Sequence, residues 1–73
     1  MEAKRIINPN GTFCYTLNGK FIRRASKRYY SYMLVINNGT SAMFIGLGNT
    51  PTTLLRNWKH LFQGQPLEVI EIE

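Results

Sequence analysis

The chain has 73 residues, enough for one small domain, and domains of about 60 residues bury only about 60% of the surface that their unfolded chains expose. Nine Lys and Arg against four Glu give a formal net charge of +5, and the segment from Ala3 to Leu67 holds all nine cations and no acid. This segment therefore lacks the paired carboxylates of many hydrolases, and a single Cys excludes an intrachain disulfide and a multi-cysteine metal site.

Asn-Gly pairs divide the first half of the chain, at Asn10-Gly11, Asn18-Gly19 and Asn38-Gly39. Both residue types tolerate the positive φ that a two-residue hairpin turn requires, so each pair predicts a turn between antiparallel strands. The segments around them have strand composition over residues 5–8, 12–17, 20–25, 28–36 and 42–47. The order of turns and strands predicts an antiparallel meander.

Two of these strands predict which faces are buried. In residues 12–17, Phe13, Tyr15 and Leu17 alternate with smaller or polar residues, which is typical of a strand with one buried face. Residues 28–36 carry apolar or aromatic side chains on both faces, so we expect this strand to be central and covered on both sides.

After residue 49 the apolar residues change from the spacing of a strand to that of an amphipathic helix. Its apolar stripe consists of Leu54, Leu55, Trp58, Leu61 and Phe62. Thr50 or Asn49 is the expected N-cap, Pro51 suits the first turn, and Gly64 and Pro66 end the helix. Residues 67–73 then form a last strand with alternating glutamates, which would pair favourably beside the basic strand 20–24. The prediction is one α+β domain over residues 1–73: a meander of four to six strands, a helix (about 50–63) on one face and a C-terminal strand.

Catalytic and metal-binding groups are sparse. His60 is the single histidine, and Cys14 lies in a strand segment where a half-buried structural role is expected. The segment from Gly46 to Pro51 joins a strand to a helix but lacks the P-loop and dinucleotide-binding patterns, so it is interpreted as an ordinary connection. We expect no enzyme activity, no catalytic residues, no metal and no cofactor.

Most of the cations gather in one basic cluster, which consists of Lys20, Arg23, Arg24, Lys27 and Arg28 and is followed directly by Tyr29. Cations beside an aromatic ring are what phosphate contact and base stacking require, so the cluster and Tyr29 form the candidate nucleic-acid site. The alternative interpretation is a solvated strand whose charges resist aggregation. A basic three-stranded sheet with one helix behind it also resembles domains that lay a sheet in a DNA groove.

The sequence leaves two functions open. The first is a small DNA-binding or RNA-binding accessory protein with a cationic sheet surface. The second is a protein-binding module, such as a phage-encoded or mobile-element-encoded inhibitor of a host factor, that binds an acidic protein surface or a second copy of itself as a homodimer. No export signal or membrane span is visible, and with the lone Cys this favours a cytoplasmic protein with no membrane partner.

Overall fold

The computed structural model spans residues 1–73 and describes residues 1–23 and 26–73. Its elements, in chain order, are β1 (Ala3–Ile7), β2 (Phe13–Leu17), β3 (Lys20–Ser26), β4 (Tyr32–Asn37), β5 (Ala42–Gly48), α1 (Pro51–Lys59) and β6 (Leu67–Glu71). Consecutive strands pair antiparallel within β1–β3 and from β4 to β5. The predicted α+β class, the meander and the C-terminal strand are confirmed.

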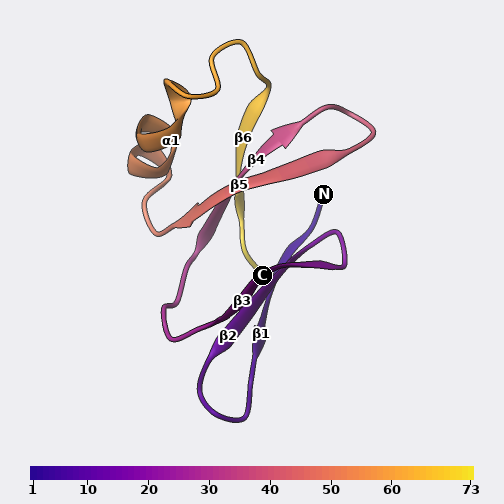
Figure 1. The fold of residues 1–73 in the computed structure, drawn as a ribbon, viewed down its shortest axis with the longest axis vertical. Coiled ribbons are helices and arrows are strands. Elements are labelled where there is room, and N and C mark those ends of the chain that lie inside the picture. The colour runs from indigo at the N-terminus through magenta and orange to yellow at the C-terminus, as the bar shows by residue number, and fades with distance from the viewer.

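The strands divide between two three-stranded sheets (Figure 1), where the sequence had suggested one. The first sheet has the order β1-β2-β3 and the second has the order β5-β4-β6. Their edges meet where the C-terminal tail lies beside β1: Glu73 N donates to Ala3 O (2.8 Å), and Arg5 N donates to Glu73 O (2.8 Å). The expected pairing of the last strand with the basic strand is wrong, because β6 pairs with β4 and its tail with β1.

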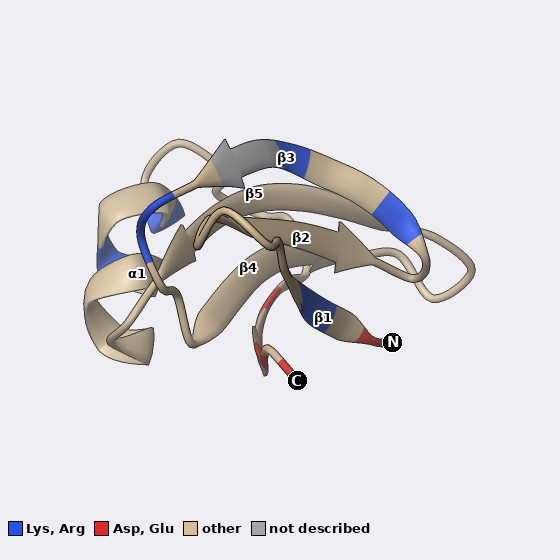
Figure 2. Cartoon of the chain, turned by 90° about the horizontal axis from the view of Figure 1, so that it is seen from below, with Lys and Arg blue, Asp and Glu red and all other residues tan. Residues whose placement is uncertain are grey.

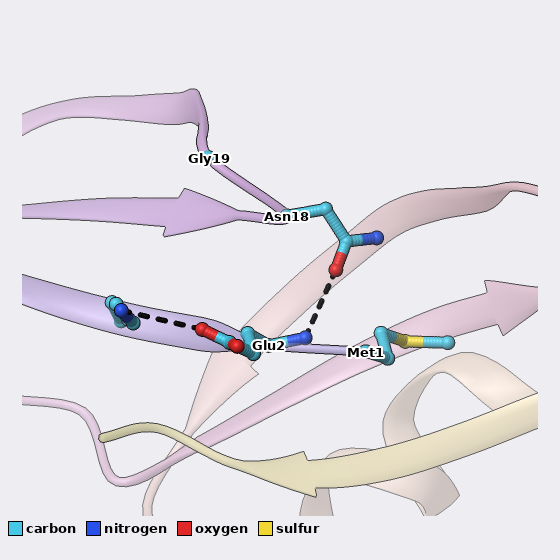
Figure 3. Close-up of a pocket in the computed structure, with 5 residues that line it drawn as sticks. Met1, Glu2, Asn18 and Gly19 are labelled. Carbon is cyan, nitrogen blue, oxygen red and sulfur yellow. Dashed lines mark hydrogen bonds and ion pairs between the residues drawn. The ribbon is translucent and has the colours of Figure 1, made fainter.

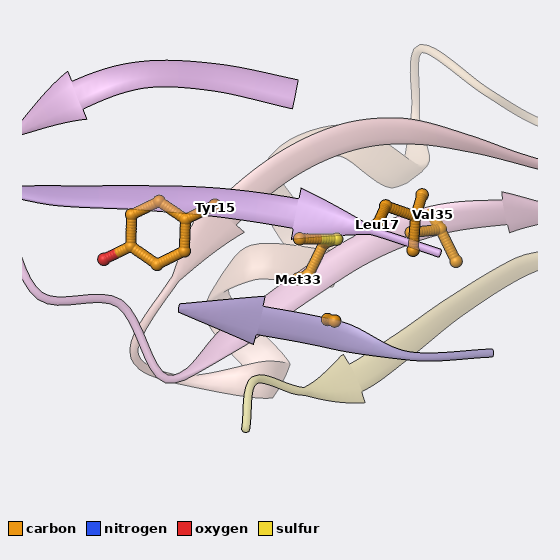
Figure 4. Close-up of a cluster of buried hydrophobic side chains, with 5 residues drawn as sticks. Tyr15, Leu17, Met33 and Val35 are labelled. Atoms are coloured by element: carbon orange, nitrogen blue, oxygen red, sulfur yellow. The ribbon is translucent and has the colours of Figure 1, made fainter. Parts of the chain in front are cut away.

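The core lies between the inner faces of the two sheets. Tyr15 and Leu17 come from β2 and Met33 and Val35 from β4, and all four side chains are buried together with Ala3 (Figure 4). The predicted inward face of strand 12–17 is therefore confirmed. Because this core is small, the burial of each large side chain accounts for a substantial part of the stability.

β4 is covered on both faces, as its composition predicted. Leu34 and Ile36 point away from the first sheet and are buried, as is Leu54 of α1, which packs against the second sheet. The molecule therefore has three layers: the first sheet, the second sheet and α1. The absence of a Cβ at Gly46 lets α1 approach closely, because a Cβ there would lie 2.8 Å from Trp58 Nε1.

The helix is shorter than predicted and ends at Lys59, not near residue 63. Leu61 lies beyond its end and is 62% exposed, so the expectation that it joins the buried stripe is wrong. Thr50 is the N-cap residue and Pro51 begins the helix, but the Thr50 side chain makes no capping hydrogen bond. No helix in residues 1–23 and 26–73 is long and apolar enough to cross a bilayer.

One of the three Asn-Gly pairs forms the tight turn that the sequence predicted. Asn18 (φ 52°) and Gly19 (φ 87°) both have positive φ and join β2 directly to β3. The other two pairs lie in longer loops, where among the described residues only the glycine of each pair has positive φ. All three pairs nevertheless lie between antiparallel strands.

Candidate nucleic-acid interface

Residues 28–31, which include Arg28 and Tyr29, form an irregular linker between β3 of the first sheet and β4 of the second. The sequence placed a strand over residues 28–36, but β4 begins only at Tyr32. The fully buried Tyr15 holds this linker, because its hydroxyl accepts from Tyr30 N (2.9 Å) and donates to Arg28 O (2.9 Å). A buried hydroxyl requires such partners, so the core itself determines where the linker runs.

Arg5 holds the same linker from β1. Its Nη2 donates to Tyr30 O (2.7 Å), and its guanidinium carbon lies 3.6 Å from the centroid of the Tyr29 ring. Its Nε is buried and has no hydrogen-bond partner within the described part of the chain. Arg5 thus acts as an internal contact, in contrast to the more exposed cations of the basic cluster.

Further hydrogen bonds hold the linker from the second sheet. The Asn49 side chain, which was one of the two expected helix caps, accepts from Ser31 N (2.9 Å) and donates to Tyr29 O (3.0 Å). Ser31 O accepts from Ile72 N (2.9 Å) in the C-terminal tail. Both sheets and the segment before α1 therefore hold residues 28–31, which places Arg28 and Tyr29 on a well-braced segment.

The basic cluster follows β3 and the turn after it. Lys20, Arg23, Lys27 and Arg28 are exposed, and the Arg23 guanidinium lies 5.9 Å from the Phe44 ring of β5, whereas Arg24 lies outside the described residues. Figure 2 shows Lys and Arg on β1, β3, this turn and α1, and Glu at the two ends of the chain. Within residues 1–23 and 26–73, the one ion pair joins Lys4 to Glu2 (3.2 Å), so no described acid neutralises the basic cluster.

Tyr29 is the aromatic residue that the sequence placed in the candidate site, and 53% of it is exposed. Arg5 covers one face of its ring, and the Phe13 ring meets it edge to face at 5.6 Å. Tyr30 is instead half-buried, with its ring 5.8 Å from that of Tyr15. The structure thus brings Tyr29 next to Arg28 in a fixed position and directs Tyr30 toward the core.

One hollow lies between the start of the chain and the turn that joins β2 to β3 (Figure 3). It measures about 370 Å³ and is lined by Met1, Glu2, Lys4, Asn18 and Gly19. Its polar groups satisfy one another: Glu2 N donates to Asn18 Oδ1 (2.9 Å), and the Glu2 carboxylate pairs with Lys4. None of the predicted site residues lines this hollow.

The other residues considered for chemistry lie far apart in the fold. Cys14 is half-buried and its Sγ accepts from Asn8 Nδ2 (3.3 Å), as expected of a structural cysteine, whereas His60 is exposed at the C-terminal end of α1. No group of three or more His, Cys, Asp or Glu able to hold a metal ion occurs among the residues that the structure describes.

The chain matches no protein-family model, no curated protein and no solved structure. The likeness to domains that lay a helix-backed sheet in a DNA groove is not reproduced, because α1 packs on the second sheet and the basic cluster lies on the first. Sequence-based prediction also missed Phe21, an exposed aromatic residue inside the basic strand. The sequence shows Phe21 next to the apolar Ile22, and strand alternation does not reveal which of these two side chains is exposed.

Proposed function

We propose that the protein is a non-enzymatic binding protein that contacts nucleic acid through the basic cluster and Tyr29. The observation that carries this proposal is the separation of charge: the exposed cations on β3 and the following turn have no acid paired with them in the described part of the chain, and the glutamates lie at the chain ends. Unpaired cations on one surface attract a polyanion without first breaking internal ion pairs.

The expected binding mode is mainly electrostatic. Each phosphate contact contributes about −0.7 to −0.9 to the slope of log affinity against log salt concentration. If each of the four described cations contacts one phosphate, the slope is about −2.8 to −3.6, and affinity falls about 50- to 150-fold between about 50 and 200 mM salt. Tyr29 adds a partly exposed ring at the end of this surface, where a base can stack.

The test is fluorescence anisotropy with labelled duplex DNA, single-stranded DNA and RNA at both salt concentrations. The double variant Arg23→Glu/Arg28→Glu is expected to abolish binding. The matched control is Arg56→Glu/Lys59→Glu, which changes the net charge by the same amount on the opposite layer of the molecule and is expected to weaken binding much less. Equal loss in the two variants would show that net charge, and not the basic cluster, causes binding.

An acidic protein surface is the alternative partner, because carboxylates are attracted by the same cations. A phage-encoded or mobile-element-encoded inhibitor of a host factor would bind one protein stoichiometrically and with a weaker dependence on salt. Failure of all three nucleic acids to bind at about 50 mM salt would overturn the proposal and favour this alternative.

A further inference from the structure

The outer face of the first sheet carries an exposed aromatic side chain that the basic cluster does not include. Phe21 of β3 lies in register with Thr16 of β2, and Thr16 lies in register with Lys4 of β1, so these three side chains share one face. It is the face opposite the core, because Tyr15 and Leu17 of β2 point inward. Phe21 is 69% exposed, and α1 packs on the other sheet.

The apolar area on this face is small. Among the described residues, Ile6 of β1, 41% exposed, is the other large apolar side chain on this face, since its register partner Cys14 alternates with Tyr15. An aromatic side chain offers about 150 to 250 Å² in total, so these two residues together fall far short of the roughly 800 Å² per partner of a stable protein interface. The area is instead comparable to that covered by one stacked base.

The surroundings of Phe21 favour an anionic ligand. Lys20 and Arg23 flank it on β3, which forms the free edge of the sheet. Lys20 lies in register with Leu17 and, past a bulge, Arg23 lies in register with Tyr15, so both cations lie on the opposite side of this edge from Phe21. The Lys4 ammonium, which shares the outer face, is already paired with Glu2. An edge strand with cations on one side and an exposed ring on the other suits a single strand, because phosphates follow the cations along the edge while an unpaired base turns over the edge and stacks on the ring.

We propose that Phe21 is a base-stacking residue and that the protein prefers single-stranded nucleic acid to duplex. This inference rests on the proposed function and specifies its ligand. In a duplex both faces of each internal base are stacked on neighbouring bases, so Phe21 gains no contact there without unstacking a step. In a single strand the phosphates lie along the edge of β3 and a base turns onto the outer face.

The experiment compares a labelled single strand of about 12 nucleotides, within the usual site size, with a duplex of the same sequence. Phe21→Ala is expected to weaken single-strand binding by about 5- to 150-fold and duplex binding by less than about 2-fold, whereas Phe21→Trp retains single-strand binding. Met43→Ala, which truncates an exposed apolar side chain on β5, is the control and leaves both affinities unchanged. Circular dichroism checks that every variant is folded.

The outcomes separate this inference from the proposed function. If both nucleic acids bind, and this binding depends on Arg23 and Arg28 but is unaffected by Phe21→Ala, the proposed function stands and the stacking role is overturned. Equal weakening of single-strand and duplex binding by Phe21→Ala also overturns the stated preference. If neither nucleic acid binds at low salt, both proposals fail together.

Discussion

Replacing Gly46 by Ala tests how α1 packs on the second sheet. The added Cβ would lie 2.8 Å from Trp58 Nε1 and 3.2 Å from Trp58 Cε2, closer than the 3.4 Å at which ordinary contact begins. The indole or the whole helix must therefore move by about 0.6 Å or more. Overpacking of this kind costs about 1–3 kcal/mol, while replacing Gly in the unfolded chain recovers about 0.4–1 kcal/mol. The expected net loss is about 1–2 kcal/mol, or about 5–15 °C in Tm.

The assay is urea unfolding followed by far-UV circular dichroism, which does not depend on Trp58. Gly48→Ala is the matched control, since its Cβ would lie 3.4 Å from Leu54 and should leave stability unchanged or slightly higher. Adding Trp58→Phe to Gly46→Ala removes the clashing indole nitrogen, so the double variant should lose less stability than the two single losses added together. Equal stability of the two alanine variants, or strictly additive losses, would refute this account of the packing.

Three further substitutions test the linker and the end of the helix. Tyr15→Phe leaves one N–H and one C=O of residues 28–31 without their partner. We expect the free energy of unfolding to fall by about 1–3 kcal/mol, measured by thermal unfolding, and amide exchange in the linker to become faster. Unchanged exchange would contradict the role of the hydroxyl. Arg5→Lys removes the guanidinium that lies over the Tyr29 ring, and we expect about 1 kcal/mol lower stability with altered Tyr29 ring signals by NMR. Wild-type signals would show that Arg5 does not hold the ring. Leu61→Ser should change stability by no more than about 0.5 kcal/mol, and a larger loss would place Leu61 in the core after all.

The features that the sequence predicted correctly depend on near neighbours. Alternation in residues 12–17 identified the inward face of β2, because side chains on a strand point to opposite faces in turn. The Asn18-Gly19 pair predicted its turn because positive φ is a local property of those residues. The basic cluster was visible for the same reason, since its members lie within nine consecutive residues.

The features that required the tertiary structure depend on residues far apart in the chain. A pattern shows that a face is apolar, but it does not say what covers it, and so the division into two sheets and the place of the last strand could not be read from composition. Nothing in the sequence around Gly46 shows that Trp58, twelve positions later, packs against it. Residues 28–31 have strand composition, yet hydrogen bonds from Tyr15, Arg5 and Asn49 hold them as a linker. Those bonds satisfy polar groups near the core, and this requirement outweighs the local preference for a strand.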